Sequence, residues 1–197
     1  MVQATNSETN AISRIIIGLG NPGEKYARNR HNAGFMVLED LARKACGHWS
    51  TGMCSRTCRI DIRGCQMLLA EPLTYMNHSG KAVRDLLSAF ERTPQDLLVV
   101  LDDLSLPLGR IRIREQGTAG GHHGLESILT ILNTDEIVRV RMGIGEETMP
   151  KDKADFVLSN FPPEKQTELS DMILKAGNAV QSILTDGVSK TMAIFNA

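Results

Sequence analysis

Four polar side chains of this sequence have types and settings suited to hydrolysis. Asn21 and His31 lie in one loop rich in Asn, Gly and Pro, Asn77 lies in a second loop, and Asp102 follows a buried apolar run. A histidine held by a carboxylate can activate water directly as a general base. A lone histidine in such a loop more often only satisfies loop carbonyl groups, so the residues alone leave both roles of His31 open.

The sequence lacks the usual signatures of a side-chain nucleophile or a metal site. It contains no Gly-x-Ser-x-Gly elbow. Its four cysteines, Cys46, Cys54, Cys58 and Cys65, have neither C-x-x-C spacing nor a paired histidine at zinc-finger distance. Cys58 alternates with charged residues as Ile60 and Ile62 do, which is typical of the inner face of a strand. We therefore expect reduced structural cysteines, as in the cytosol, and no metal site.

The run Gly18-Leu19-Gly20-Asn21-Pro22-Gly23 matches the G-x-G-x-x-G pattern of dinucleotide-binding enzymes. In those enzymes the last glycine opens a helix, and an acidic residue that binds the ribose follows about 20 residues later at the end of a second strand. Here the glycine leads into a polar stretch without a helical face, and the later region has a helical pattern. The context argues against a nicotinamide enzyme, and we expect no cofactor.

The elements that must position these side chains follow from hydrophobic periodicity. Apolar runs and alternating patterns predict strands over residues 14–20, 56–63, 65–70, 97–101, 109–114 and 137–144. Apolar positions at helical spacing predict helices over residues 35–45, 82–90, 125–132, 163–186 and 188–195. Alternation of strands and helices favours one α/β domain with a mixed, mostly parallel twisted sheet and helices on both faces. In such sheets the site gathers outside the carboxyl ends of the strands.

Length, composition and charge narrow the class of protein. A chain of 197 residues with 42% hydrophobic and 23% charged residues is an ordinary globular chain with one core. Its apolar runs are too short for a membrane span, and its polar N-terminus lacks the apolar stretch of a signal peptide. We expect a disordered polar tail over residues 1–13, a domain over 14–197, a cytoplasmic location and a monomer. A net charge of −1 argues against a positive electrostatic field over the whole protein surface, which would attract DNA or RNA.

Five motifs make the chain resemble the bacterial-type peptidyl-tRNA hydrolases. Beyond the glycine run and Tyr26, they are Arg30-His31-Asn32-Ala33-Gly34-Phe35, Pro72-Leu73-Thr74-Tyr75-Met76-Asn77-His78-Ser79-Gly80, Asp102-Asp103-Leu104-Ser105-Leu106-Pro107, Gly120-Gly121-His122-His123-Gly124-Leu125 and Arg139-Val140-Arg141-Met142-Gly143-Ile144-Gly145. They stand in the family's order and spacing from about Arg14 to the C-terminus. The resemblance implies hydrolysis of the ester bond between the peptide and the 3′ ribose of tRNA, without a metal or cofactor.

The resemblance also implies roles for single residues. His31 is the expected base, oriented by Asp102, while Asn21 and Asn77 hold the peptide and the attacking water. Further substrate-binding positions are Tyr26, Tyr75, Met76, His122 and His123. Neutral amides suit this task because a carboxylate would attract the free α-ammonium of an ordinary aminoacyl-tRNA.

Two positions depart from the family pattern. His123 stands where the family usually has Asn, which leaves the role of this side chain in doubt. Ser105 stands where an acidic residue is common, which puts only a secondary contact near Asp102 in doubt.

A local basic patch is the expected contact with RNA. Arg110, Arg112 and Arg114 alternate with inward isoleucines, and Arg139 and Arg141 repeat the arrangement. Such charges also protect ordinary edge strands. The resemblance implies that Arg112, Arg114 and Arg141 face phosphates of the tRNA acceptor arm, near the 3′ end.

A second class of function remains for this fold. A relative that has lost hydrolysis could act as an RNA-binding factor in splicing or on the ribosome. The complete set of His31, Asp102, Asn21 and Asn77 favours the enzyme over this alternative.

Overall fold

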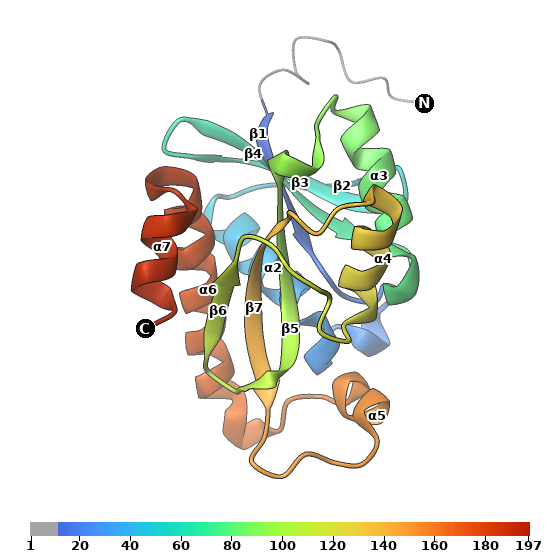
Figure 1. Ribbon diagram of the computed structural model, residues 1–197, viewed down its shortest axis with the longest axis vertical. Coiled ribbons are helices and arrows are strands. Elements are labelled where there is room, and N and C mark those ends of the chain that lie inside the picture. The colour runs from blue at the N-terminus through green and yellow to red at the C-terminus, as the bar shows by residue number, and fades with distance from the viewer. Residues whose placement is uncertain (1–11) are drawn as a thin grey trace.

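Seven strands form one sheet in the computed structural model, which describes residues 12–197 (Figure 1). In chain order they are β1 Ile12–Gly18, β2 Trp49–Gly52, β3 Ser55–Ile62, β4 Cys65–Pro72, β5 Leu97–Pro107, β6 Ile111–Arg114 and β7 Val138–Gly145. Their order across the sheet is β2-β3-β4-β1-β5-β7-β6. The first strand begins two residues before the expected domain boundary, and the rest of the expected tail lies outside the described residues.

The four central strands are parallel, and the strands at both sides are antiparallel. β1 pairs with β4 and β5, and β5 pairs with β7, all in parallel. β1 and β5 contain the continuous apolar runs 15–17 and 97–101, which are buried because helices cover both faces of the sheet. β2, β3 and β6 add antiparallel partners. The expected mixed α/β fold is confirmed.

Helices cover the two faces in separate layers (Figure 1). The α-helices are α2 Ala33–Lys44, α3 Ser79–Ala89, α4 His123–Leu132, α5 Lys153–Leu158, α6 Gln166–Asp186 and α7 Val188–Phe195. Short 3₁₀ helices are η1 Glu24–Tyr26, η2 Arg30–Asn32, η3 Met76–His78, η4 Pro94–Asp96 and η5 Pro163–Lys165. The apolar stripes of α2 and α6 bury one core with the sheet, and those of α3 and α4 bury a second core on the other face.

The structure differs from the sequence-based prediction in three elements. β5 is longer than expected, because β7 continues to pair alongside it, so that Asp102 and Asp103 lie inside the strand opposite Met142 and Gly143. The exposed edge strand β2 was not predicted, because only its pairing with β3 makes it a strand. The short helix α5 was also missed; its first turn is capped by the side chain of Asp152.

The described chain has no helix with the length and apolar character that a membrane crossing requires.

Glu71 near the end of β4 is a buried carboxyl group that accepts no hydrogen bond within the described part of the chain. The side chain lies directly opposite Arg56 on β3, whose Nη1 is 3.2 Å from Oε2. Arg56 also pairs with Glu39 at 2.9 Å and stacks on Trp49, and neither oxygen of Glu71 accepts a hydrogen bond from a described residue. Burial raises the pKa of Glu71 to about 8, against the opposing effect of Arg56.

We expect Glu71→Gln to stabilise the fold increasingly between pH 4.5 and pH 8. In the unfolded chain the carboxyl ionises near its ordinary pKa of 4.5, whereas the folded protein retains the proton up to about pH 8. Wild-type stability therefore falls through this window, and glutamine, which resembles the protonated form, removes the loss. The gain at pH 8 is on the order of 4 kcal/mol.

Urea unfolding at pH 4.5, 7 and 9 measures this difference. The matched control is Glu39→Gln, which alters the half-exposed partner of the same arginine and should not reproduce the effect. Parallel stability curves for wild type and Glu71→Gln across the three pH values would contradict the assignment.

Candidate active site

The segments that carry the candidate residues meet at the carboxyl ends of the parallel strands. The loop after β1 carries Asn21 and His31, the loop after β4 carries Asn77, and Asp102 lies in β5 next to β1. This convergence was expected from the α/β pattern. A direct hydrogen bond from the backbone N–H of Met76 to Oδ1 of Asn21, 2.9 Å long, joins the first two loops.

His31 is held by a close approach between the helix that follows it and the sheet. A Cβ on Gly34, in the first turn of α2, would lie 2.4 Å from the carbonyl oxygen of Val100 and 2.5 Å from the backbone nitrogen of Leu19. Only glycine allows this contact. Asn32 adds a second constraint, because its side-chain amide makes two 3.0 Å hydrogen bonds to the backbone of Asn21. The 3₁₀ turn with His31 is thereby fixed beside β5.

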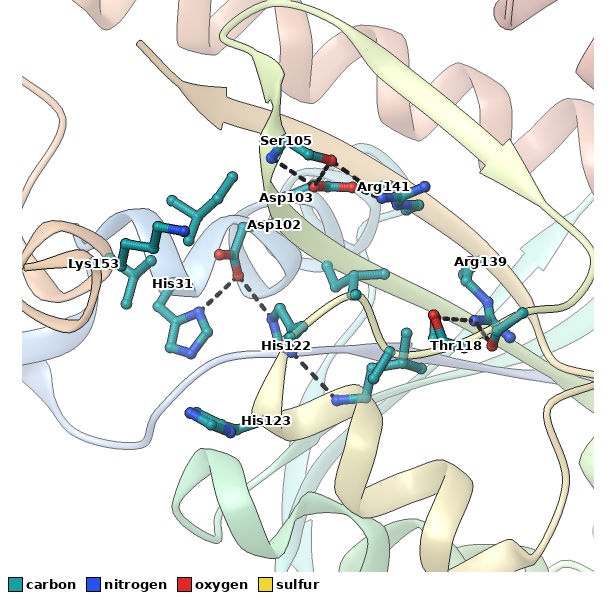
Figure 2. A pocket seen from close by; sticks show the side chains of 18 of the residues that line it. His31, Asp102, Asp103, Ser105, Thr118, His122, His123, Arg139, Arg141 and Lys153 are labelled. Atoms are coloured by element: carbon teal, nitrogen blue, oxygen red, sulfur yellow. Dashed lines mark hydrogen bonds and ion pairs between the residues drawn. The ribbon is translucent and has the colours of Figure 1, made fainter. Parts of the chain in front are cut away.

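His31, Asp102 and His122 form a buried row (Figure 2). Nδ1 of His31 lies 2.8 Å from Oδ1 of Asp102, and Nε2 of His122 lies 3.0 Å from the same oxygen. The centroids of the two imidazole rings are 4.7 Å apart. The pairing of His31 with an aspartate is as expected, whereas the contact of His122 with Asp102 was not predicted.

Hydrogen bonding defines which ring nitrogens carry protons. Nδ1 of His122 accepts a 3.3 Å hydrogen bond from the backbone N–H of Leu125, which caps α4. This ring must therefore carry its proton on Nε2 and donate it to Asp102. His31 likewise donates from Nδ1 to the carboxylate, so its Nε2 carries the free lone pair that a base requires.

The charge of Asp102 is maintained by its two neighbours. Burial alone would raise the pKa of this carboxyl group, but His122 and His31 outweigh burial and hold the pKa of Asp102 well below its ordinary range. A carboxylate in this position stabilises the imidazolium that forms when His31 accepts a proton. The pair has the geometry of a base and the residue that orients it.

The two candidate amides differ in their availability. Oδ1 of Asn21 already accepts the hydrogen bond from Met76, while Nδ2 makes no hydrogen bond to a described residue. Asn21 is therefore left mainly as a hydrogen-bond donor toward a substrate. Asn77, in η3, is exposed and has no hydrogen bond to another described side chain. Both amides leave donor groups, although neither Asn21 nor Asn77 is among the residues that line the cavity beside His31.

A cavity of about 840 Å³ opens beside this row. Its walls include His31, the glycine turn before α4, and Val157 and Leu158 of α5, so its lining combines polar and apolar surface. His123 also lines the cavity, with a side chain that is 74% exposed and an Nδ1 that lies 3.5 Å from Oε2 of Glu126 (Figure 2). Tyr75 is exposed, and Tyr26 is half-buried beneath the ammonium of Lys25.

The arginines near the cavity divide into two groups. Arg112 is exposed and Arg114 half-buried, and the cross-strand register places them opposite Arg141 and Arg139. Arg141 is paired with Asp103, within reach of Ser105. The sequence pattern predicted that Arg139 would be exposed like its neighbours, and this prediction is wrong. Arg139 is only 2% exposed and donates hydrogen bonds to the carbonyl groups of Ile137, Gly117, Thr118 and Asp135. It stabilises the turn instead.

The buried row also has the donor types of a metal site. The ligand atoms of His31, Asp102 and His122 lie within 4.8 Å of one another. The atoms that meet at Asp102, Nδ1 of His31 and Nε2 of His122, already donate the hydrogen bonds described above, so a metal ion bound at that point would have to displace a proton from each ring.

Three functional neighbours escaped the sequence-based reasoning. Asn32 and Arg30 flank His31 in the motif but had no assigned task, and His122 was placed among substrate contacts. A polar residue on each side of a candidate histidine is a usable signal for supporting contacts. No such signal in the sequence indicates that His122 contacts Asp102, because the two residues are 20 positions apart.

The comparisons with known proteins agree over nearly the whole chain. Residues 15–197 match the family described as peptidyl-tRNA hydrolase. The peptidyl-tRNA hydrolase of Thermotoga petrophila is 44% identical over 183 residues, which cover 93% of this chain and 97% of that protein. The one of Gloeobacter violaceus is 40% identical over 186 residues, with 93% and 94% covered.

Solved structures give the same result. The crystal structure of peptidyl-tRNA hydrolase from Acinetobacter baumannii superposes with a TM-score of 0.86 at 33% identity and covers 94% of this chain and 96% of that chain. A peptidyl-tRNA hydrolase crystallised in complex with N-propanol gives a TM-score of 0.87 at 33% identity, with the same coverage.

Proposed function

The chain belongs to the peptidyl-tRNA hydrolase family and hydrolyses peptidyl-tRNA, and from this premise we propose that His31 is the general base and that Asp102 orients it. The family membership confirms the resemblance seen in the sequence. The observation that carries the proposal is the 2.8 Å contact between Nδ1 of His31 and Oδ1 of Asp102 beside the cavity.

The reaction then follows from the free lone pair on Nε2 of His31. A water molecule beside Nε2 attacks the ester carbonyl carbon as the imidazole takes its proton. The negative charge that develops on the carbonyl oxygen is stabilised by the donors of Asn21 and Asn77. The ester C–O bond breaks, and Nε2 returns its proton to the departing ribose oxygen. Asp102 stabilises the intermediate imidazolium, and the products are a free peptide carboxyl group and tRNA.

Two substrates test this function directly. The protein should hydrolyse N-acetyl-aminoacyl-tRNA and leave the same aminoacyl-tRNA with a free α-amino group intact. Release of tRNA from both substrates at equal rates would contradict recognition of the blocked amine. Binding of tRNA without hydrolysis would instead support the RNA-binding alternative, which the complete set of site residues and the family do not favour.

We expect Asn21→Asp to weaken the discrimination between these two substrates. The new carboxylate can still accept the hydrogen bond from Met76, so the loops stay joined, but it replaces the Nδ2 donor by a negative charge. The charge attracts the α-ammonium of ordinary aminoacyl-tRNA. The ratio of kcat/KM values for blocked and unblocked substrates should fall by about tenfold or more. An unchanged ratio would exclude neutrality at this position as a source of selectivity.

Three arginines of the β6–β7 pair are proposed to bind the acceptor arm of tRNA. Arg112, Arg114 and Arg141 share one side of the β6–β7 pair next to the cavity, and phosphate contacts set position without reading sequence. This suits an enzyme that must accept every elongator tRNA. Released tRNA returns to translation, so the proposed physiological role is recycling of tRNA from stalled or prematurely dropped products. We further propose a cytoplasmic monomer.

We expect Arg112→Ala and Arg114→Ala to weaken tRNA binding in a salt-dependent manner. Each arginine that contacts a phosphate should lower the slope of log Kd against log salt by about 1. Binding of uncharged tRNA at several salt concentrations measures the slope. Arg84→Ala is the matched control, because this exposed arginine of α3 pairs with Asp85. Equal slopes for wild type and both variants would exclude the patch.

A further inference from the structure

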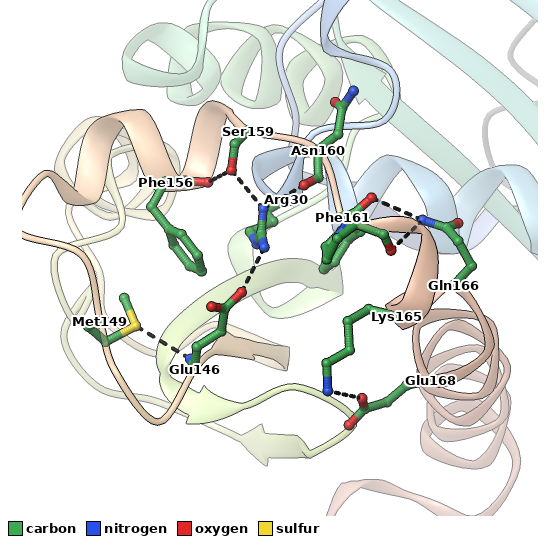
Figure 3. A network of polar contacts seen from close by, with 11 residues as sticks. Arg30, Glu146, Met149, Phe156, Ser159, Asn160, Phe161, Lys165, Gln166 and Glu168 are labelled. Carbon is green, nitrogen blue, oxygen red and sulfur yellow. Dashed lines mark hydrogen bonds and ion pairs between the residues drawn. The ribbon is translucent and has the colours of Figure 1, made fainter.

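Arg30, immediately before His31, is a buried arginine with partners on one distant segment (Figure 3). Its Nη1 donates to Oγ of Ser159 and to the carbonyl oxygen of Asn160, each at 2.6 Å, and its Nη2 donates to Oε1 of Glu146 at 2.8 Å. The guanidinium carbon lies 4.2 Å from the ring centroid of Phe156. Arg30 itself is only 6% exposed.

These partners mark both ends of a segment that forms one wall of the cavity. Glu146 directly follows β7, and Ser159 and Asn160 directly follow α5. Between them, Met149, Lys153, Ala154, Val157 and Leu158 line the cavity, and Lys153 lies beside His31 (Figure 2). One guanidinium therefore closes the base of this loop, and Phe156 adds a third point of attachment from within α5.

The wall is also attached through apolar contacts of Phe156, Met149 and Val157 with the core and through two backbone contacts with the turn before His31. The backbone N–H of Arg30 donates to the carbonyl oxygen of Ser159 at 3.0 Å, and Asn29 forms an isolated bridge with Asn160. Both hold only the end of the segment that follows α5. At the end that follows β7, pairing with β5 and the hydrogen bond from the backbone N–H of Leu108 hold the chain as far as Gly145, and Arg30 binds the side chain of the next residue, Glu146, at 2.8 Å.

The chemistry of this contact favours arginine specifically. A planar guanidinium can donate to a carboxylate, a hydroxyl group and a carbonyl group at once while its face stacks on an aromatic ring. Hydrogen bonds to a charged group are also stronger than neutral ones. Lysine supplies one compact ammonium group and cannot hold three separate partners in this geometry.

We propose that Arg30 is a positioning residue, which fixes the cavity wall formed by residues 146–160 at a set distance from His31 and so determines how tightly the peptidyl end of the substrate binds. The proposal rests on the proposed function, in which substrate reacts beside His31. Arg30 acts through the wall and touches no reacting atom. Its loss releases one end of the loop, and the apolar wall then no longer meets the bound substrate.

Kinetics of conservative variants separate this role from a purely structural one. Arg30→Lys should raise KM for N-acetyl-aminoacyl-tRNA by about tenfold and change kcat by no more than about twofold, because misplacement of the wall affects binding first. Glu146→Gln, which removes the charged partner at one end only, should raise KM by about threefold. Glu147→Gln is the matched control. The side chain of Glu147, next to Glu146, is exposed and makes no ion pair with a described residue, so this substitution should leave KM unchanged.

Proteolysis gives an independent readout of the wall. Trypsin can cut after Lys151 and Lys153 within the segment, and cleavage there should accelerate by about tenfold or more in Arg30→Lys and less in Glu146→Gln, since local opening exposes the loop. Ile183→Ala in α6 destabilises the fold at a buried site beneath α7 and serves as the control for global unfolding. It should not change the ratio of cleavage in this segment to cleavage elsewhere.

The outcomes are distinct. Raised KM together with faster local cleavage in both the Arg30 and Glu146 variants supports the positioning role. Unchanged KM with a fall in kcat that matches the loss of folded enzyme, as in Ile183→Ala, overturns it and leaves Arg30 a structural residue. If His31 is not the base, His31 variants will keep their activity while the KM shifts of the Arg30 and Glu146 variants persist. Failure of the proposed function is therefore distinguishable from failure of the positioning role of Arg30.

Discussion

His31→Gln is expected to lower the single-turnover rate of peptidyl-tRNA hydrolysis by about 10³-fold, the contribution of a well-placed general base. Glutamine retains a polar side chain of similar reach but has no lone pair able to accept a proton from water. Affinity for tRNA should remain at the wild-type level, because the proposed phosphate contacts lie on β6 and β7. Rapid mixing of excess enzyme with N-acetyl-aminoacyl-tRNA measures the chemical step without product release.

A second histidine provides the control for this prediction. His48 is exposed before β2 and lies outside the cavity lining, so His48→Gln should hydrolyse at the wild-type rate. A His31→Gln enzyme that retains a rate within tenfold of wild type would show that another group accepts the proton.

Asp102→Asn is expected to reduce the same rate by about 10²- to 10⁴-fold. Two imidazole rings donate to one oxygen of this carboxylate. An asparagine can offer one neutral oxygen, which no longer stabilises the imidazolium. If its amide turns instead, the Nδ2 group faces Nδ1 of His31 and favours the wrong tautomer. In both orientations the lone pair on Nε2 becomes a poorer base.

The substitution should also alter the response of stability to acid. Because the pKa of Asp102 is held low in the fold, ionised Asp102 stabilises the native state above its unfolded pKa, and this stabilisation is lost as the pH falls. Asp102→Asn removes this dependence, so its unfolding free energy should vary less with pH in the acid range than that of wild type. Wild-type activity with an unchanged acid dependence would remove Asp102 from the account.

The fold was largely predictable because its central elements carry strong local signals. The helices α2, α3, α4 and α6 bury regular apolar stripes, and the core strands β1 and β5 contain continuous apolar runs. The elements that were not predicted have weak local signals: β2 depends on a partner strand, and α5 has only six residues. The extension of β5 through Asp102 depends on β7, which follows more than 30 residues later in the chain.

The pairing at the centre of the site was predictable from the family motifs, whereas contacts that depend on burial were not. The residues alone left the role of His31 open, the resemblance paired it with Asp102, and the structure brings the two side chains together. Arg139 has the same type and spacing as its exposed neighbours, yet four backbone carbonyl groups draw it into the interior. His122 and Arg30 likewise gain their tasks from partners far along the chain. Alternation in one strand cannot reveal such partners.

The pH dependence of the single-turnover rate tests the central claim most directly. After subtraction of the rate without enzyme, the wild-type rate should rise by about tenfold per pH unit on the acid side and then level off, as expected when a single general base takes the proton from water. The residual rate of His31→Gln should lack both this rise and the plateau. The same rise and plateau in the variant would contradict His31 as the group that takes the proton from water.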